Sequence, residues 1–139
     1  MKIIAKFDID AGSREEAIRR AAPEVLVRSV DEFVKDVMAR EAMSSTDVGN
    51  GIAIPHARSS SVKESFVSFL RLKKEINGIR YLFLLGAKDS EEREYMKMLT
   101  QIARTLLVES FVEKLESIKD EEEFKKELEL AIKAVEAED

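Results

Sequence analysis

The chain has 139 residues, of which 45% are hydrophobic and 37% are charged, and this balance excludes a disordered, collagenous or disulfide-stapled protein. A chain of this length buries enough surface to form one compact domain, which we expect to span residues 1–139. The net charge is -5, no basic stripe with interleaved aromatic residues occurs, and no apolar run is long enough to span a bilayer. Neither nucleic acid nor the membrane is therefore an expected partner, and a cytoplasmic location is the simplest interpretation.

The first predicted elements are a strand over residues 3–9 and a helix that begins beside Ser13. Ser13 and Glu16 have the Ser-x-x-Glu spacing of a capping box, in which each side chain binds the backbone N–H of the other residue. Pro23 lacks a backbone N–H, and a proline ring clashes with the preceding helical turn. The helix is therefore predicted to end or kink near Ala22.

A second helix is predicted from Ser29, which repeats the capping spacing with Glu32, to Arg40 or Glu41. Its apolar residues recur at helical intervals and predict one buried face, made of Val30, Phe33, Val34, Val37 and Met38. Polar residues and the Gly-Asn-Gly sequence at residues 49–51 indicate that a turn follows.

Three apolar segments in the middle of the chain predict strands, over residues 52–54, 66–72 and 79–85. Pro55 ends the first of them, and its ring restricts both its own backbone and that of the residue before it. We therefore expect a rigid turn that leads from this strand to His56.

Three further helices are predicted after these strands, because a capping residue precedes an apolar helical pattern in each case. The predicted caps are the pairs Asp89 with Glu92, Ser110 with Glu113 and Asp120 with Glu123. Strands separated by capped helices favour an α/β fold, in which helices cover both faces of a small sheet and functional loops gather at strand ends.

Residues 46–57 stand apart from ordinary fold-forming sequence, because they place the only histidine, His56, on a rigid support. Glycines allow a turn before the strand, Pro55 restricts the chain, and Ala57 leaves space beside the ring. A neutral imidazole is a nucleophile near neutral pH, and a phosphorylated ring is an energetic phosphoryl donor. A lone histidine is more often a surface or core residue, so the joint spacing of the motif is what points to a phosphoryl carrier.

Arg40 is the candidate for phosphate stabilisation, because it ends the helix that leads into the glycine turn. An arginine fork binds the equatorial oxygens of a transferring phosphoryl group, and backbone N–H groups near Gly51 are further candidates. Taken alone, an arginine at this place is more often a solvated charge at a helix end, and a glycine a turn former. Arg58 is adjacent to the motif, and its direction is left open.

Residues 49–57 resemble the phosphorylation site of the enzyme IIA domains of the bacterial phosphotransferase system, in the branch with the mannitol, fructose and nitrogen-regulatory members. Arg40-Glu41 and Thr46 also match that pattern, and a weaker likeness in the order of helices and strands runs from residue 13 to about residue 132. The resemblance implies a small mixed sheet between helices. It also implies that a histidine phosphocarrier protein phosphorylates His56, which passes the phosphate to an enzyme IIB domain in sugar uptake.

The chain departs from this resemblance at two places. Tyr95 stands where many members carry a second active-site histidine, and its side chain is predicted either to line the phosphate site or to pack in the core. The passage from Phe66 to Gly86 is shorter than in related domains, which bears on the partner more than on the chemistry. Two alternatives stay open: a regulatory protein whose phosphorylation state controls a partner, and a catalytically silent interaction module.

Other chemistries find little support in the sequence. One histidine and no cysteine leave only carboxylates as further metal ligands, and no spacing groups them, so neither a metal nor a cofactor is expected. The Gly-x-Ser-x-Gly elbow of serine hydrolases, the P-loop and the dinucleotide-binding fingerprint are all missing. The predicted site consists of His56 and Arg40 as catalytic residues, with Thr46, Gly51 and Tyr95 as phosphate-binding or site-lining residues.

Overall fold

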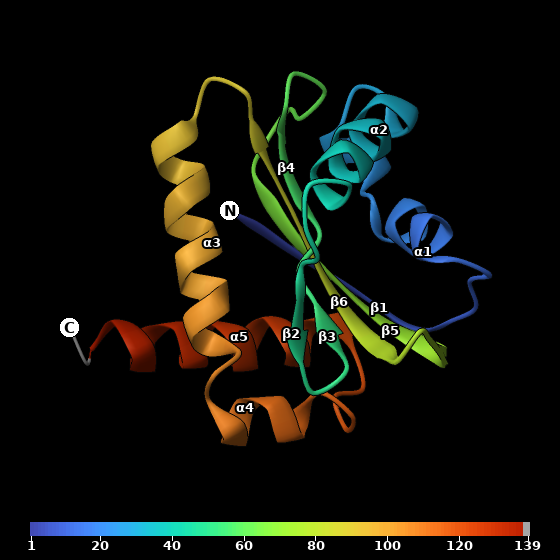
Figure 1. The fold of residues 1–139 in the computed structure, drawn as a ribbon. Coiled ribbons are helices and arrows are strands. Elements are labelled where there is room, and N and C mark those ends of the chain that lie inside the picture. The colour runs from blue at the N-terminus through green and yellow to red at the C-terminus, as the bar shows by residue number, and fades with distance from the viewer. Residues whose placement is uncertain (138–139) are drawn as a thin grey trace.

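A mixed β-sheet with helices on both faces is the framework of the computed structural model, which describes residues 1–137 (Figure 1). The strands within these residues are β1 Lys2–Ile9, β2 Asp47–Gly49, β3 Ile52–Ala53, β4 His56–Ser59, β5 Phe66–Ile76 and β6 Ile79–Lys88. The helices are α1 Arg14–Ala21, α2 Val30–Glu41, α3 Glu92–Thr105, α4 Glu109–Lys114 and α5 Glu121–Glu136, and a 3-10 turn spans Glu24–Leu26. Over this part of the chain, no helix combines the length and the apolar character needed to cross a bilayer. The predicted α/β class is confirmed.

The order of the strands places β6 at the centre of the sheet. This order is β1-β5-β6-β3-β2, and β4 also pairs with β6. β5 and β6 form an antiparallel hairpin closed by Asn77 and Gly78, whose positive φ angles of 50° and 84° suit a two-residue turn. β1 runs parallel to β5, while β3 and β4 both run parallel to β6. The residues of the histidine motif are thus aligned along one long strand.

Two apolar layers hold the helices against the sheet (Figure 1). α1 and α2 cover one face, where Phe33 and Phe66 are fully buried and their rings meet edge to face. α3, α4 and α5 cover the other face, where Phe69 stacks on Phe124 with ring centroids 4.5 Å apart. Successive side chains of β5 and β6 point to opposite faces, so these two strands contribute to both layers.

Three predicted N-caps are confirmed, and they explain where α1, α2 and α5 begin. The caps are Ser13, Ser29 and Asp120, whose side chains accept from the N–H groups of Glu16, Glu32 and Glu123 at 3.1, 3.2 and 2.8 Å. The predicted helix ends near Ala22 and at Glu41 are also confirmed. One detail of the first capping box differs, because the carboxylate of Glu16 accepts from the N–H of Gly12 at 2.7 Å, one residue before the cap.

The predicted caps of α3 and α4 are wrong. α3 begins after Glu91, whose side chain makes no capping bond, and Asp89 lies in the turn that follows β6. The strand runs beyond its predicted end, so a turn is needed before the helix can start. α4 begins after Val108, so Ser110 lies inside the helix. Phe111 is buried in the core, and this determines which side of the helix faces inward.

Candidate functional site

The histidine motif lies along two short strands that share one neighbour. β3 pairs with β6 at Tyr81 and Leu82, and β4 begins at His56, which pairs with Leu85. Pro55 has no N–H for the ladder, but its carbonyl accepts from the N–H of Leu85 at 3.0 Å. The rigid turn predicted after Pro55 is therefore wrong. The chain is interrupted there and continues as a strand, because β6 is long enough to pair beyond the proline.

The imidazole of His56 is held by a backbone carbonyl. Its Nδ1 atom lies 2.6 Å from the carbonyl oxygen of Ile54. A carbonyl oxygen only accepts, so Nδ1 carries the proton, and Nε2 keeps its lone pair. The N–H of Ile54 donates in turn to the carbonyl of Thr46 at 3.0 Å, which ties this short segment to the start of the motif. The ring is therefore fixed as the tautomer with a nucleophilic Nε2.

The surroundings of His56 favour the neutral ring. Burial lowers the pKa of the imidazole from its ordinary value of 6.5, and the nearby charge of Arg40 lowers it further, while the bond to Ile54 and the charge of Glu41 act in the opposite direction. Only 6% of His56 is exposed, so burial is the largest of these effects on its pKa. At neutral pH the imidazole is therefore uncharged and available as a nucleophile.

Tyr95 of α3 lies beside the imidazole. The two ring centroids are 5.9 Å apart, with 44° between the ring planes. Tyr95 is partly buried and also contacts the core beneath α3, so its side chain packs there, and a role in lining the phosphate site stays a prediction. Burial raises the pKa of its hydroxyl, against the opposing charges of Arg40 and Arg58. The hydroxyl stays protonated near neutral pH and is able to donate a hydrogen bond.

Arg58 belongs to the same face of the sheet as His56, a placement that the sequence prediction left open. Partners in the register point to the same side, and His56 pairs with Leu85 while Arg58 pairs with Ala87. Leu85 and Ala87 both lie in the core covered by α3. Arg58 is exposed, and its Nη1 donates to the carbonyl of Asp89 at 3.2 Å. The two-residue spacing from His56 was the signal that could have placed it, once β4 was known to be a strand.

Arg40 reaches the site from the last turn of α2, on the opposite face of the sheet. Its positive charge lowers the pKa of both His56 and Tyr95. Its Nη1 donates to the carbonyl of Ser44 at 3.1 Å and to the Ser44 hydroxyl at 3.3 Å. These are its bonds within residues 1–137, and they leave Nε and Nη2 for an anion. The structure thus places the rings of His56 and Tyr95 side by side, with Arg40 acting on both through its charge.

The hydroxyl of Thr46 is engaged away from the imidazole. It donates to Oε1 of Glu41 at 2.9 Å and accepts from Nη2 of Arg14 at 2.8 Å. Thr46 is buried at 6% exposure, so these bonds replace those that water would make. Its connection to His56 runs through its backbone carbonyl and Ile54. A direct contact of Thr46 with phosphate stays a prediction.

Gly51 lies in the turn between β2 and β3, with a φ of 73° that favours glycine. Its carbonyl accepts from the N–H groups of Arg80 and Tyr81. Tyr81 is four residues before Leu85, the partner of His56, so the turn lies about 13 Å from His56 along β6. The structure does not bring Gly51 to the imidazole, and its role in phosphate binding stays a prediction.

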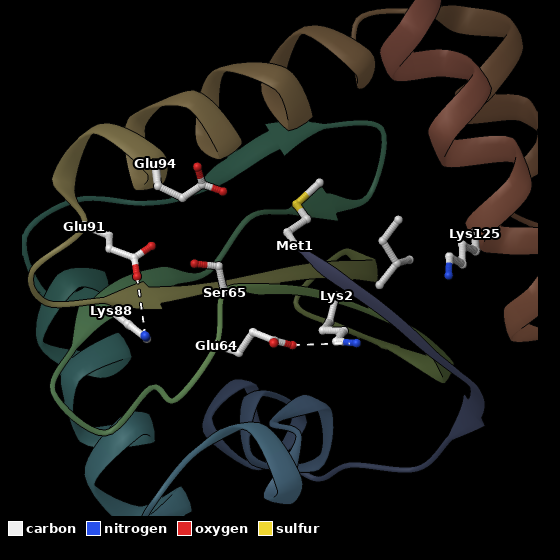
Figure 2. Close-up of a pocket in the computed structure, with 9 residues that line it drawn as sticks. Met1, Lys2, Glu64, Ser65, Lys88, Glu91, Glu94 and Lys125 are labelled. Carbon is white, nitrogen blue, oxygen red and sulfur yellow. Dashed lines mark ion pairs between the residues drawn. The ribbon is translucent and has the colours of Figure 1, made fainter.

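A surface pocket of about 490 Å³ lies elsewhere, beside the start of β1 (Figure 2). It is lined by Met1, Lys2, Ile3, Glu64, Ser65, Lys88, Glu91, Glu94 and Lys125. Two ion pairs bring opposite charges together in it, Lys2 with Glu64 at 3.8 Å and Lys88 with Glu91 at 3.6 Å. It therefore presents no concentrated charge of one sign. In the part of the chain that the structure describes, no three histidine or acidic side chains are arranged to hold a metal ion.

Comparison with known proteins identifies relatives over most of the chain. Residues 2–130 match the family model described as phosphoenolpyruvate-dependent sugar phosphotransferase system, EIIA 2. The chain is 29% identical over 137 residues to the mannitol-specific phosphotransferase enzyme IIA component of Bacillus subtilis, covering 88% of this chain and 94% of that one. It is also 29% identical over 92 residues to the PTS system fructose-like EIIA component of Escherichia coli K12, covering 61% of this chain and 62% of the relative. The chain also matches multiphosphoryl transfer protein 1 of the same strain, and this match spans 15% of the length of that protein.

Solved structures share the fold. The nitrogen regulatory protein IIA-Ntr of Neisseria meningitidis superposes with a TM-score of 0.76 and 23% identity, covering 91% of both chains. Escherichia coli enzyme IIA mannitol, in its complex with phosphorylated enzyme IIB mannitol, gives a TM-score of 0.69 and 23% identity over 91% of this chain and 93% of that one. At this identity the likeness shows the fold alone, whereas the family match shows membership. The chain belongs to the EIIA type-2 family of the phosphoenolpyruvate-dependent sugar phosphotransferase system, whose members are phosphotransferase components.

Proposed function

We propose that this chain is a phosphoryl carrier and that Nε2 of His56 is the atom that accepts the phosphate. The donor is a phosphorylated histidine phosphocarrier protein, and the acceptor is an enzyme IIB domain. The lone pair of Nε2 forms an N–P bond as the N–P bond of the donor breaks, and the donor imidazole leaves with that electron pair. The proton on Nδ1 stays in its bond to Ile54 throughout.

The observation that carries this proposal is the 2.6 Å contact between Nδ1 of His56 and the carbonyl of Ile54. It directs the lone pair of the ring to Nε2, and burial keeps the ring neutral by lowering its pKa. A buried ring that served only for packing would not need one nitrogen fixed and the other left without a protein partner. Within residues 1–137, the hydrogen bond of this ring to the protein is made by Nδ1.

Arg40 and Tyr95 have the chemistry to stabilise the phosphoryl group at this place. A loose transition state spreads charge over three equatorial oxygens, and positive groups nearby lower its energy. The guanidinium of Arg40 supplies that charge through Nε and Nη2, and the hydroxyl of Tyr95 adds a neutral donor. Arg40 also keeps the pKa of His56 low, which preserves the nucleophile before the transfer.

The assignment of an enzyme IIB domain as acceptor is supported by the similarity to enzyme IIA mannitol, which was solved in complex with phosphorylated enzyme IIB mannitol. The assignment of the donor follows from family membership and from the energy of the N–P bond, which permits transfer between imidazoles in either direction. Sugar uptake is the corresponding pathway, in line with the likeness to mannitol and fructose-like components.

The proposal is tested by incubating the protein with several phosphorylated histidine phosphocarrier proteins and measuring the incorporated phosphate. Wild type should be labelled and should pass the label to an enzyme IIB domain, and His56→Ala should not be labelled. Circular dichroism of the variant controls for folding. Equal labelling of the His56→Ala variant would overturn the assignment, and an unlabelled wild type would favour a catalytically silent interaction module.

A regulatory function is the second candidate, and Tyr95 is the observation that favours it. By the family resemblance it stands where many members carry a second histidine, its ring lies beside His56, and the fold is shared with a nitrogen regulatory protein. Phosphate on His56 would change the charge of a docking face, which is a simple physical switch. Affinity purification with the unphosphorylated protein and with the phosphorylated protein separates the two candidates. Recovery of enzyme IIB domains alone would remove the regulatory one.

A further inference from the structure

We propose that Arg14 is a positioning residue for phosphoryl transfer, which acts through Glu41 and Thr46 to hold Arg40 beside His56. The inference rests on the proposed function and assigns a role to a residue of the first helix that the sequence motif does not contain. Arg14 is 42 positions before His56 in the sequence, and its contacts are made to the two ends of the turn that follows Arg40 and Glu41.

The first contact of Arg14 is with the end of α2. Its Nη2 lies 3.0 Å from Oε1 and 3.2 Å from Oε2 of Glu41, and its Nε lies 3.3 Å from Oε1. The side chain of Glu41 is only 9% exposed, whereas that of Arg14 is 26% exposed. A forked contact of this kind fixes both the position and the orientation of a carboxylate. Glu41 is the residue directly after Arg40, so this contact anchors the backbone that carries the candidate phosphate-binding cation.

The second contact of Arg14 is with the start of β2. Its Nη2 donates to the hydroxyl of Thr46 at 2.8 Å, and its Nη1 lies 2.7 Å from Oδ1 of Asp47. Thr46 closes the arrangement by donating to Oε1 of Glu41 at 2.9 Å. One guanidinium therefore bridges the two ends of the turn at residues 42–45. Without it, α2 and β2 would be joined there by the turn itself and by the hydrogen bond of Thr46 to Glu41.

The groups of the site depend on this same turn. Inside it, the carbonyl and the hydroxyl of Ser44 accept from Nη1 of Arg40 at 3.1 and 3.3 Å. At its end, the carbonyl of Thr46 accepts from the N–H of Ile54, whose own carbonyl orients His56. A misplacement of about 1 Å at a reacting centre reduces a rate on the order of a hundredfold. Loosening the bridge is therefore expected to slow transfer without touching the reacting atoms.

The alternative is that the ion pair of Arg14 with Glu41 serves stability alone. Comparison with a neighbouring ion pair distinguishes this alternative from a positioning role. Arg19 of α1 forms an ion pair with Asp31 of α2, so it joins the same two helices. That pair lies at the other end of α2 and makes no contact with the turn at residues 42–45. Arg19→Gln is therefore a matched control: it removes a cation and an α1–α2 ion pair and should leave the transfer rate unchanged.

A double-mutant cycle tests the proposal by single-turnover transfer from a phosphorylated histidine phosphocarrier protein to wild type, Arg14→Gln, Arg40→Gln and the double variant. Because Arg14 acts mainly through Arg40, Arg14→Gln should slow the transfer on the order of tenfold in wild type and by much less in the Arg40→Gln background. Arg14→Lys, which keeps the charge without the fork, should slow it less. An equal slowing in both backgrounds, or no slowing in wild type, would overturn the proposal.

A second variant and a second readout keep the test decisive. If Arg14→Gln does not fold, Thr46→Val removes the hydroxyl between Arg14 and Glu41 at similar volume and should show the same dependence on Arg40. NMR titration of the single histidine then reports the charges around it, those of Arg40 and Glu41, without any transfer. Its pKa should rise in Arg14→Gln as the guanidinium moves away. If wild type accepts no phosphate, the proposed function fails, and an unchanged pKa in Arg14→Gln would still overturn the positioning role.

Discussion

Nδ1 of His56 lies 2.6 Å from the carbonyl oxygen of Ile54, so the imidazole is oriented by a residue only two positions before it. Pro55, between them, provides no N–H and interrupts the strand at this point. The carbonyl of Ile54 is thereby used for the ring, while that of Pro55 continues the ladder to Leu85. The short Ile-Pro-His sequence thus places a backbone carbonyl against Nδ1 and leaves Nε2 as the free nitrogen.

The side chain of Arg40 should contribute to transfer mainly through its forked charge. Charge-assisted hydrogen bonds are worth about 1.5–3 kcal/mol, so Arg40→Gln should reduce the rate of transfer to His56 roughly tenfold to a hundredfold. Arg40→Lys should lose part of this, because a lysine binds as a point charge. Rapid-quench labelling with a phosphorylated carrier protein measures both. A rate for Arg40→Gln equal to that of wild type would contradict this role.

Tyr95 should act through its ring more than through its hydroxyl. Tyr95→Phe keeps the ring against His56, at a centroid distance of 5.9 Å in the wild type, and removes only one neutral donor worth about 1 kcal/mol. We expect it to slow transfer by less than about tenfold and to keep the melting temperature. Tyr95→Ala should lower the stability by about 1–2 kcal/mol, since the side chain is only partly buried. Equal transfer rates for the two variants would show that the ring is dispensable.

The titration of His56 should reflect its burial. Its folded pKa lies below the unfolded value of 6.5, so the unfolded chain binds the proton more readily. The contribution of this group to stability is therefore present above pH 6.5 and is lost as the pH falls through the folded pKa. NMR should place the midpoint below 6.5, and Arg40→Gln should raise it because a repelling charge is removed. A midpoint at or above 6.5 in wild type would contradict this account of the site.

Gly86 should tolerate no side chain, because it lies opposite Ala57 in the sheet and beneath two aromatic rings. A Cβ atom there would lie 2.5 Å from Cζ of Phe66 and 3.1 Å from Cε1 of Phe33. Gly86→Ala should lower the free energy of unfolding by about 1–3 kcal/mol, measured by urea denaturation. Gly12→Ala is the control, since its added Cβ would meet only the flexible carboxylate of Glu16 at 3.2 Å. A Gly86→Ala variant as stable as wild type would show that this packing adapts.

Local sequence rules predicted most of the elements. The Ser-x-x-Glu pairs at Ser13 and Ser29 mark true helix starts, because the cap and the helix it serves are contiguous in sequence. The same rule failed at Asp89, where the length of β6 and the turn after it decide where α3 begins. The strand propensity of a segment does not show how far a central strand will pair with its neighbours.

The candidate site was predictable only in part, for the same physical reason. His56 belongs to the motif at residues 46–57, Arg40 was singled out at the end of the helix that leads into it, and Tyr95 was singled out by resemblance. The strand conformation after Pro55 depends on pairing with β6, so the shared direction of His56 and Arg58 was not visible in the sequence. The bridge made by Arg14 joins residues 27 to 33 positions apart, a contact that only the packing of α1 against α2 creates.

The atom that carries the phosphate is the most direct test of the account as a whole. Wild type, labelled with 15N in the imidazole, would be phosphorylated by a carrier protein and examined by long-range 1H–15N and 31P NMR. We predict phosphate on Nε2 of His56, with the proton still on Nδ1 as its bond to Ile54 requires. Phosphate on Nδ1, or phosphate bound to any residue other than His56, would contradict it.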